Sequence, residues 1–186
     1  KMKNYWQNAV TFDEYIKETE RRIEVQNPED DHNEYYELGL QRMNRTLKTY
    51  KADEKQLETL KSKNFNGKIL IITEPWCGDA SATVPAVSKF FEGHNEVRIF
   101  YRDSDTSLID QFLTNGTQSI PKILILNEDF SLKNVWGPRP QYGTELLKKF
   151  KENPETYPRE EFYNDLQVYY AKNKGKDAIQ EILELL

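Results

Sequence analysis

The spacing of hydrophobic positions changes twice along the chain and divides it into three zones. Residues 8–62 place apolar side chains three and four positions apart, which predicts amphipathic helices. Residues 68–73 instead carry a continuous apolar run, which is typical of a strand buried on both faces. From residue 153 onward the helical spacing returns, so we expect a strand-containing centre between two helical ends.

Two polar residues mark where helices of the first zone begin. Thr11 followed three positions later by Glu14 fits a capping box, in which each side chain bonds the backbone of the other. Apolar positions in 36–50 predict a second helix, and Asp53 can cap a third. Near the other end, Gly175 is expected to separate or kink the two helical segments of the last zone.

The central zone alternates strand and helix patterns. We expect strands at 68–73, 96–101, 122–126 and 132–136, and helices at 78–92, 105–114 and 141–150. The order β-α-β-α-β-β-α predicts parallel strands joined by right-handed crossovers, followed by an antiparallel edge hairpin.

Charge and composition exclude several classes of protein. The formal net charge is −5, with no clustered basic face, so we expect no nucleic-acid partner. No apolar run approaches the roughly 20 residues needed to span a bilayer, and no signal-peptide pattern is visible. Lys1 before Met2 suggests that Met2 is the natural start, and we expect a cytoplasmic protein. Cys77 is the single cysteine, which makes an internal disulfide impossible.

One motif lies where the first strand meets the following helix: Trp76-Cys77-Gly78-Asp79-Ala80. Pro85 follows Cys77 by eight residues, Ile120-Pro121 opens a strand 44 residues after it, and Gly137 ends the last strand. Together these spacings resemble the thioredoxin-like superfamily, and the motif resembles a bacterial subfamily with a single active-site cysteine. The resemblance implies an α/β thioredoxin-like fold, with a mixed four-stranded sheet flanked by helices.

The resemblance also suggests a division of the chain. Residues 63–152 would form the thioredoxin-like domain, and residues 1–62 an N-terminal helical extension. Residues 153–186 would form a C-terminal helical extension that packs on the same domain.

The resemblance assigns roles to the motif residues. Cys77 is the expected catalytic nucleophile, because unpaired N–H groups and the dipole at a helix N-terminus lower a thiol pKa. A cis peptide bond at Pro121 would leave the backbone of Ile120 free to pair with a bound peptide or thiol. Trp76 would provide an apolar surface beside the sulfur of Cys77. The expected substrate-binding residues are Trp76, Gly78, Asp79, Ile120 and Pro121.

Two positions depart from the family pattern. Ala80 replaces the second cysteine, which releases mixed disulfides in dithiol thioredoxins. Ile71 stands where those proteins keep a buried acidic residue that serves this second thiol. Asp79 adds a negative charge that should partly offset thiolate stabilisation. The nearest cationic candidates are Arg102, Lys122 and Arg139.

The leading hypothesis is monothiol thiol–disulfide exchange with a protein disulfide or mixed disulfide. An external thiol such as glutathione would resolve the intermediate, and no other cofactor is expected. The alternative is a non-catalytic binding module that recognises a peptide or protein. A third hypothesis, an iron–sulfur cluster shared by two subunits through Cys77, conflicts with the motif of known examples. His32 and His94 lack metal-ligand spacing to Cys77, so no metal site is expected.

Overall fold

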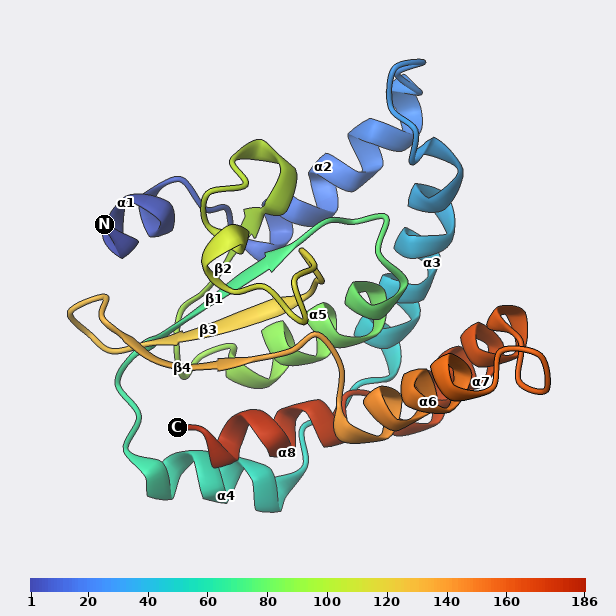
Figure 1. Cartoon of the computed structure of the whole chain (residues 1–186). Coiled ribbons are helices and arrows are strands. Elements are labelled where there is room, and N and C mark those ends of the chain that lie inside the picture. Colours follow the sequence, from blue (N-terminus) through green and yellow to red (C-terminus); the bar gives the residue numbers. More distant parts are fainter.

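A computed structural model describes residues 1–186 as a four-stranded sheet covered by helices (Figure 1). The strands are β1 (Lys68–Thr73), β2 (Val97–Tyr101), β3 (Lys122–Leu126) and β4 (Leu132–Trp136). The helices are α1 (Met2–Gln7), α2 (Phe12–Val25), α3 (Asn33–Thr49), α4 (Glu54–Lys63), α5 (Gly78–Phe91), α6 (Gln141–Glu152), α7 (Arg159–Asn173) and α8 (Lys176–Glu184). None of these helices has the length and hydrophobicity of a membrane-spanning segment.

The strands lie in the order β2-β1-β3-β4. β1 pairs in parallel with β2, whereas β3 is antiparallel to both β1 and β4. The predicted mixed four-stranded sheet is therefore confirmed, but the prediction that β3 continues the parallel arrangement is wrong. Only the β1–β2 connection contains a crossover helix, α5. The next connection has no such helix, and the chain enters the sheet on the other side of β1 in the opposite direction.

The helix predicted at 105–114 does not form. The connection holds two short 3-10 turns, Arg102–Ser104 and Ile109–Gln111. The Asp105 carboxylate accepts hydrogen bonds from the backbone N–H and the hydroxyl of Ser107, which closes a local turn. Such side-chain bonds offer the backbone an alternative to the helix. Of the apolar residues in 105–114, Leu108 and Ile109 are buried, whereas Leu113 is 44% exposed.

Alternate residues of β1 contribute to two cores on opposite faces of the sheet. Ile69 and Ile71 pack in the larger core, which α5 and parts of α2, α3, α4 and α8 complete. Leu70 and Ile72 pack in the smaller core with Trp6 and with residues of the β2–β3 connection. Helix α1, which the sequence did not predict, thus helps to cover the face that has no crossover helix.

The helices of the N-terminal and C-terminal zones begin and end largely where the sequence predicted. The Thr11–Glu14 capping box forms at the start of α2, and Asp53 caps α4. Gly175 separates α7 from α8 with a positive φ, and a Cβ there would lie 2.4 Å from the Cβ of Ala86. α3 and α7 both contact α5, and α4 lies beside α8 (Figure 1).

Candidate functional site

Cys77 lies at the corner between β1 and α5 and is the N-cap of α5. Its Sγ donates a hydrogen bond to the carbonyl oxygen of Ile120, 3.4 Å away. The Ile120–Pro121 peptide bond is cis. Gly137, at φ +122°, allows this arrangement, because a Cβ there would lie 2.4 Å from the Pro121 oxygen. Cys77, the Ile120–Pro121 peptide bond and Gly137, which are far apart in the sequence, therefore lie close together in the fold.

The environment of Cys77 raises the pKa of its thiol to about 12. Burial is the largest cause, and the negative charge of Asp79 is the second. The backbone N–H groups of Ala80 and Asp79 and the positive charge of Arg139 act in the opposite direction. The prediction that the helix N-terminus produces a net lowering of the pKa is therefore wrong, because loss of hydration outweighs the effect of the helix.

Asp79 is buried in the first turn of α5 and bonded to two distant residues. Its carboxylate forms an ion pair with Arg139, with an N–O distance of 3.0 Å, and accepts a hydrogen bond from the Tyr170 hydroxyl. Burial raises the pKa of Asp79, whereas Arg139 and Tyr170 lower it. The carboxylate thus faces the protein, and its charge is balanced by a residue that precedes α6.

Gly78 lies against helix α7. The Gln167 side-chain amide donates a hydrogen bond to the Gly78 carbonyl oxygen, 3.4 Å away. A Cβ at Gly78 would lie 3.1 Å from the Gln167 Nε2 atom, so glycine permits close contact between α5 and α7 here. The C-terminal helices therefore form part of the surroundings of Cys77.

Trp76 is half-buried between protein side chains. The ring of His32 stacks on it with a centroid separation of 4.1 Å and an interplanar angle of 7°. The Arg102 guanidinium lies 5.0 Å from the centre of the Trp76 ring. Trp76 also packs with Cys77 against the smaller core. A residue from the α2–α3 loop thus covers the side chain that the sequence suggested as a substrate wall.

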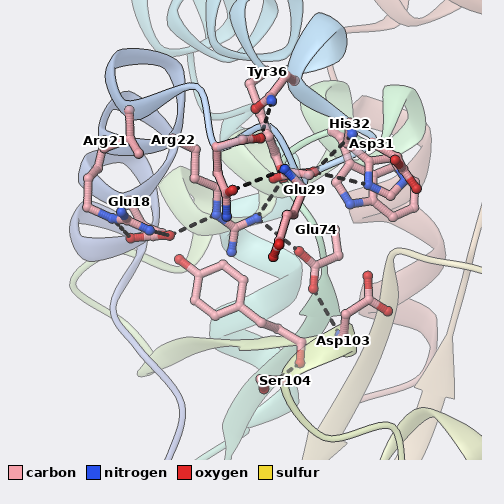
Figure 2. Close-up of a pocket in the computed structure, with 16 residues that line it drawn as sticks. Glu18, Arg21, Arg22, Glu29, Asp31, His32, Tyr36, Glu74, Asp103 and Ser104 are labelled. Atoms are coloured by element: carbon pink, nitrogen blue, oxygen red, sulfur yellow. Dashed lines mark hydrogen bonds and ion pairs between the residues drawn. The ribbon is translucent and has the colours of Figure 1, made fainter.

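A cleft of about 730 Å³ opens beside Trp76, between α2, the α2–α3 loop and the end of β2 (Figure 2). Glu74 is buried at its base and accepts hydrogen bonds from the Arg22 guanidinium at 3.3 Å and the Asp103 backbone N–H at 2.9 Å. Burial raises the pKa of Glu74. Arg22 also pairs with Glu18 at 2.7 Å, so α2 is tied to the segment that leads into Cys77.

The other predicted residues lie as follows. Ile120 and Pro121 are buried, and Ile71 is fully buried in the larger core. Of the cationic candidates, Arg139 alone is a cause of the thiol pKa shift. Arg102 pairs with Asp103, and Lys122 donates to Thr114 and to the Gly137 carbonyl oxygen.

Several residues around the motif were missed from the sequence. Glu74 had a usable signal, because a carboxylate directly after a buried strand and before the motif is unusual. Glu18 and Arg22 are four residues apart on one helix, a spacing that predicts an ion pair. Tyr170 and Gln167 had no signal, because their contacts depend on how α7 packs against α5.

Comparisons with known proteins agree with this fold. A family model described as thioredoxin matches residues 25–151. A crystal structure of an HIV epitope-scaffold is similar, with a TM-score of 0.68 and 15% identity over 98% of this chain and 94% of that chain. A protein of unknown function from Pseudomonas aeruginosa has a TM-score of 0.59 and 17% identity over 95% and 91% of the two chains. No curated protein matches. The chain belongs to the thioredoxin family, and its one cysteine lies at the corner between β1 and α5.

Proposed function

We propose that Cys77 carries out thiol–disulfide exchange as a single cysteine and that an external thiol completes the cycle. The observation that carries the proposal is the position of the Cys77 sulfur, at the N-cap of α5 and against the Ile120 carbonyl beside Pro121. Trp76, Gly78 and Asp79 line the same corner. The expected substrates are protein disulfides or mixed disulfides.

The proposed reaction has two balanced steps. Cys77 loses its proton to water, and the thiolate attacks one sulfur of a disulfide to form a mixed disulfide, while the other sulfur leaves as a thiolate and is protonated. An external thiolate then attacks the mixed disulfide and releases Cys77. A second external thiol completes the two-electron reduction of the substrate outside the protein, because Ala80 cannot supply a resolving sulfur.

The raised pKa slows this reaction without abolishing it. Each added pKa unit lowers the thiolate fraction at neutral pH tenfold, but raises the nucleophilicity of the thiolate with a Brønsted coefficient of about 0.4–0.5. Between an ordinary pKa of about 8.5 and the value of about 12 for Cys77, the net loss of rate is roughly 100-fold. A thiol of high pKa is also a poor leaving group, so the mixed disulfide should persist.

The test is to incubate the protein with glutathione disulfide between pH 7 and pH 10 and to follow the adduct by mass spectrometry. We expect one mixed disulfide, at Cys77, whose rate of formation still rises above pH 9. Cys77→Ser is the control and should form none. Absence of any adduct at pH 10 in protein that remains folded by circular dichroism would overturn the proposal.

The raised thiol pKa also favours a second candidate, a binding module without catalysis. Such a module would recognise a peptide or protein at the corner around Trp76 and Pro121 without using the sulfur. Partners captured equally by the native protein and by Cys77→Ser would support this function. Partners recovered only through a disulfide to Cys77 would support exchange.

A further inference from the structure

A groove separate from the cleft at Trp76 runs between α3 and α7. It consists of two neighbouring cavities of about 790 and 150 Å³, which are both lined by Arg42, Arg45, Thr49, Gln167 and Ala171. No aspartate or glutamate lines either cavity. Its charged residues are Arg42, Arg45, Lys48 and Lys174, so the groove is cationic in a chain whose net charge is −5.

None of these four cations has a partner of opposite charge. Their side chains form no ion pair and donate no hydrogen bond within the protein, whereas Arg22 and Arg139 are both paired. Arg42 is half-buried, and burial and the charge of Arg45 lower its pKa. A partly buried cation beside a like charge is unfavourable unless an anion compensates it. The groove therefore has the charge expected of an anion-binding site, with one half-buried cation, Arg42, and three exposed ones.

Two side chains that line the groove lie beside Gly78, the residue that follows the candidate nucleophile. A Cβ built on Gly78 would lie 3.8 Å from the Nη1 atom of Arg42 and 3.1 Å from the Nε2 atom of Gln167. Both of these side chains line the groove. Because Gly78 follows Cys77 directly, an anion held by Arg42 would lie close to the position where a substrate sulfur meets Cys77.

We propose that the groove binds the carboxylate groups of a low-molecular-weight thiol or its disulfide and presents its sulfur to Cys77. The planar arginine guanidinium matches a carboxylate through two parallel hydrogen bonds. The volume is that of a small-molecule site. The cleft at Trp76 is lined by six acidic residues, which disfavours an anion on that side. The delivery of sulfur rests on the exchange function proposed for Cys77, whereas the binding of the anion does not.

Binding is tested with S-methylglutathione, which carries two carboxylates and cannot form a disulfide. Titration followed by amide chemical shifts should place it between α3 and α7. The variant Arg42→Gln/Arg45→Gln should weaken its binding by roughly tenfold or more, because each hydrogen bond to a charged group contributes about 1.5–3 kcal/mol. Lys151→Gln, an exposed cation on α6, is the matched control and should bind normally. Equal affinity of the double variant and the native protein, or no binding at millimolar ligand, would overturn the inference.

Exchange kinetics then separate this inference from the function on which it rests. With glutathione disulfide, which is anionic, the double variant should react about tenfold more slowly than the native protein, by the same hydrogen bonds. With neutral 2-hydroxyethyl disulfide, the two should react equally. If both disulfides react and the double variant reacts as fast as the native protein, the groove is not an anion site, and the exchange function stands. Binding that depends on the two arginines, without exchange at any pH, would support the anion site and overturn the exchange function. If a glutamate-rich peptide binds more tightly through the same arginines, the ligand of the groove is an acidic protein segment and not a small thiol.

Discussion

Tyr170 donates a buried hydrogen bond to Asp79, 91 residues earlier in the sequence. Asp79 lies two residues after Cys77, so α7 contributes directly to the first turn of α5. The same carboxylate pairs with Arg139. The charge that raises the pKa of Cys77 is therefore held in place by a residue of the C-terminal helices.

Tyr170→Phe should destabilise the protein, because the buried Asp79 carboxylate loses one of its two partners. We expect the free energy of unfolding to fall by about 1–3 kcal/mol, measured by urea denaturation at pH 7. Tyr163→Phe is the matched control on the same helix, since Tyr163 is 50% exposed and its loss should change stability by less than about 0.5 kcal/mol. Equal stabilities of the two variants would show that the bond to Asp79 contributes nothing.

Asp79→Asn should lower the pKa of Cys77, because it removes the second largest cause of the upward shift. Burial remains, so the pKa should stay above its ordinary value. At pH 8 the rate of alkylation by iodoacetamide should rise by about threefold for each unit by which the pKa falls. The pH profile of this rate measures the shift directly.

The control for this shift is Glu145→Gln, an exposed carboxylate on α6. It should leave the alkylation profile unchanged. A profile for Asp79→Asn that coincides with the native one would contradict a charge effect of Asp79 on the sulfur.

Ala80→Cys should restore an internal disulfide to the motif. Residue 80 lies in the first turn of α5, three positions after Cys77, which is the spacing of Cys-X-X-Cys redox motifs. Oxidised protein should lose both free thiols in a titration with a thiol reagent and regain them after reduction. Ala82→Cys, which points toward the groove between α3 and α7, should keep both thiols free. Two free thiols in oxidised Ala80→Cys would mean that the corner does not have the geometry of a dithiol site.

Glu18→Gln should make the free energy of unfolding depend less on pH in the acid range. Arg21 and Arg22 lower the pKa of Glu18 to about 2. Glu18 thus has a lower pKa in the folded protein than in the unfolded chain. Its contribution to the free energy of unfolding is therefore present above about pH 4.5 and disappears as the pH falls toward 2. The variant should lose about 2 kcal/mol at pH 7, a value reduced because Glu18 is partly exposed and its pairs are partly screened. At pH 2 it should lose almost nothing, because there the native carboxylate is half protonated.

Urea denaturation at both pH values measures this contribution. Glu20→Gln, an exposed residue without an ion pair, should show no such difference between the two values. A stability loss for Glu18→Gln that is the same at pH 2 and pH 7 would contradict the linkage.

The spacing of apolar residues predicted all four strands and seven of the eight helices. The run Ile69–Ile72 predicted a strand buried on both faces, and two separate cores do cover it. The same spacing did not reveal that β3 runs antiparallel to β1, or that 105–114 forms turns. Periodicity reports which residues become buried, whereas strand direction depends on how the chain crosses the sheet.

The sequence by itself determined that this member of the thioredoxin family has one thiol, because Cys77 is its single cysteine and Ala80 cannot supply a second. It also located that sulfur at the start of a helix. Only the tertiary structure decided the net effect on the thiol, because burial and the charges of Asp79 and Arg139 act over distances in space. The position of the unpaired Arg42 beside Gly78 was likewise decided only by the packing of α3 on α5, since an ion pair or its absence is a property of the folded chain.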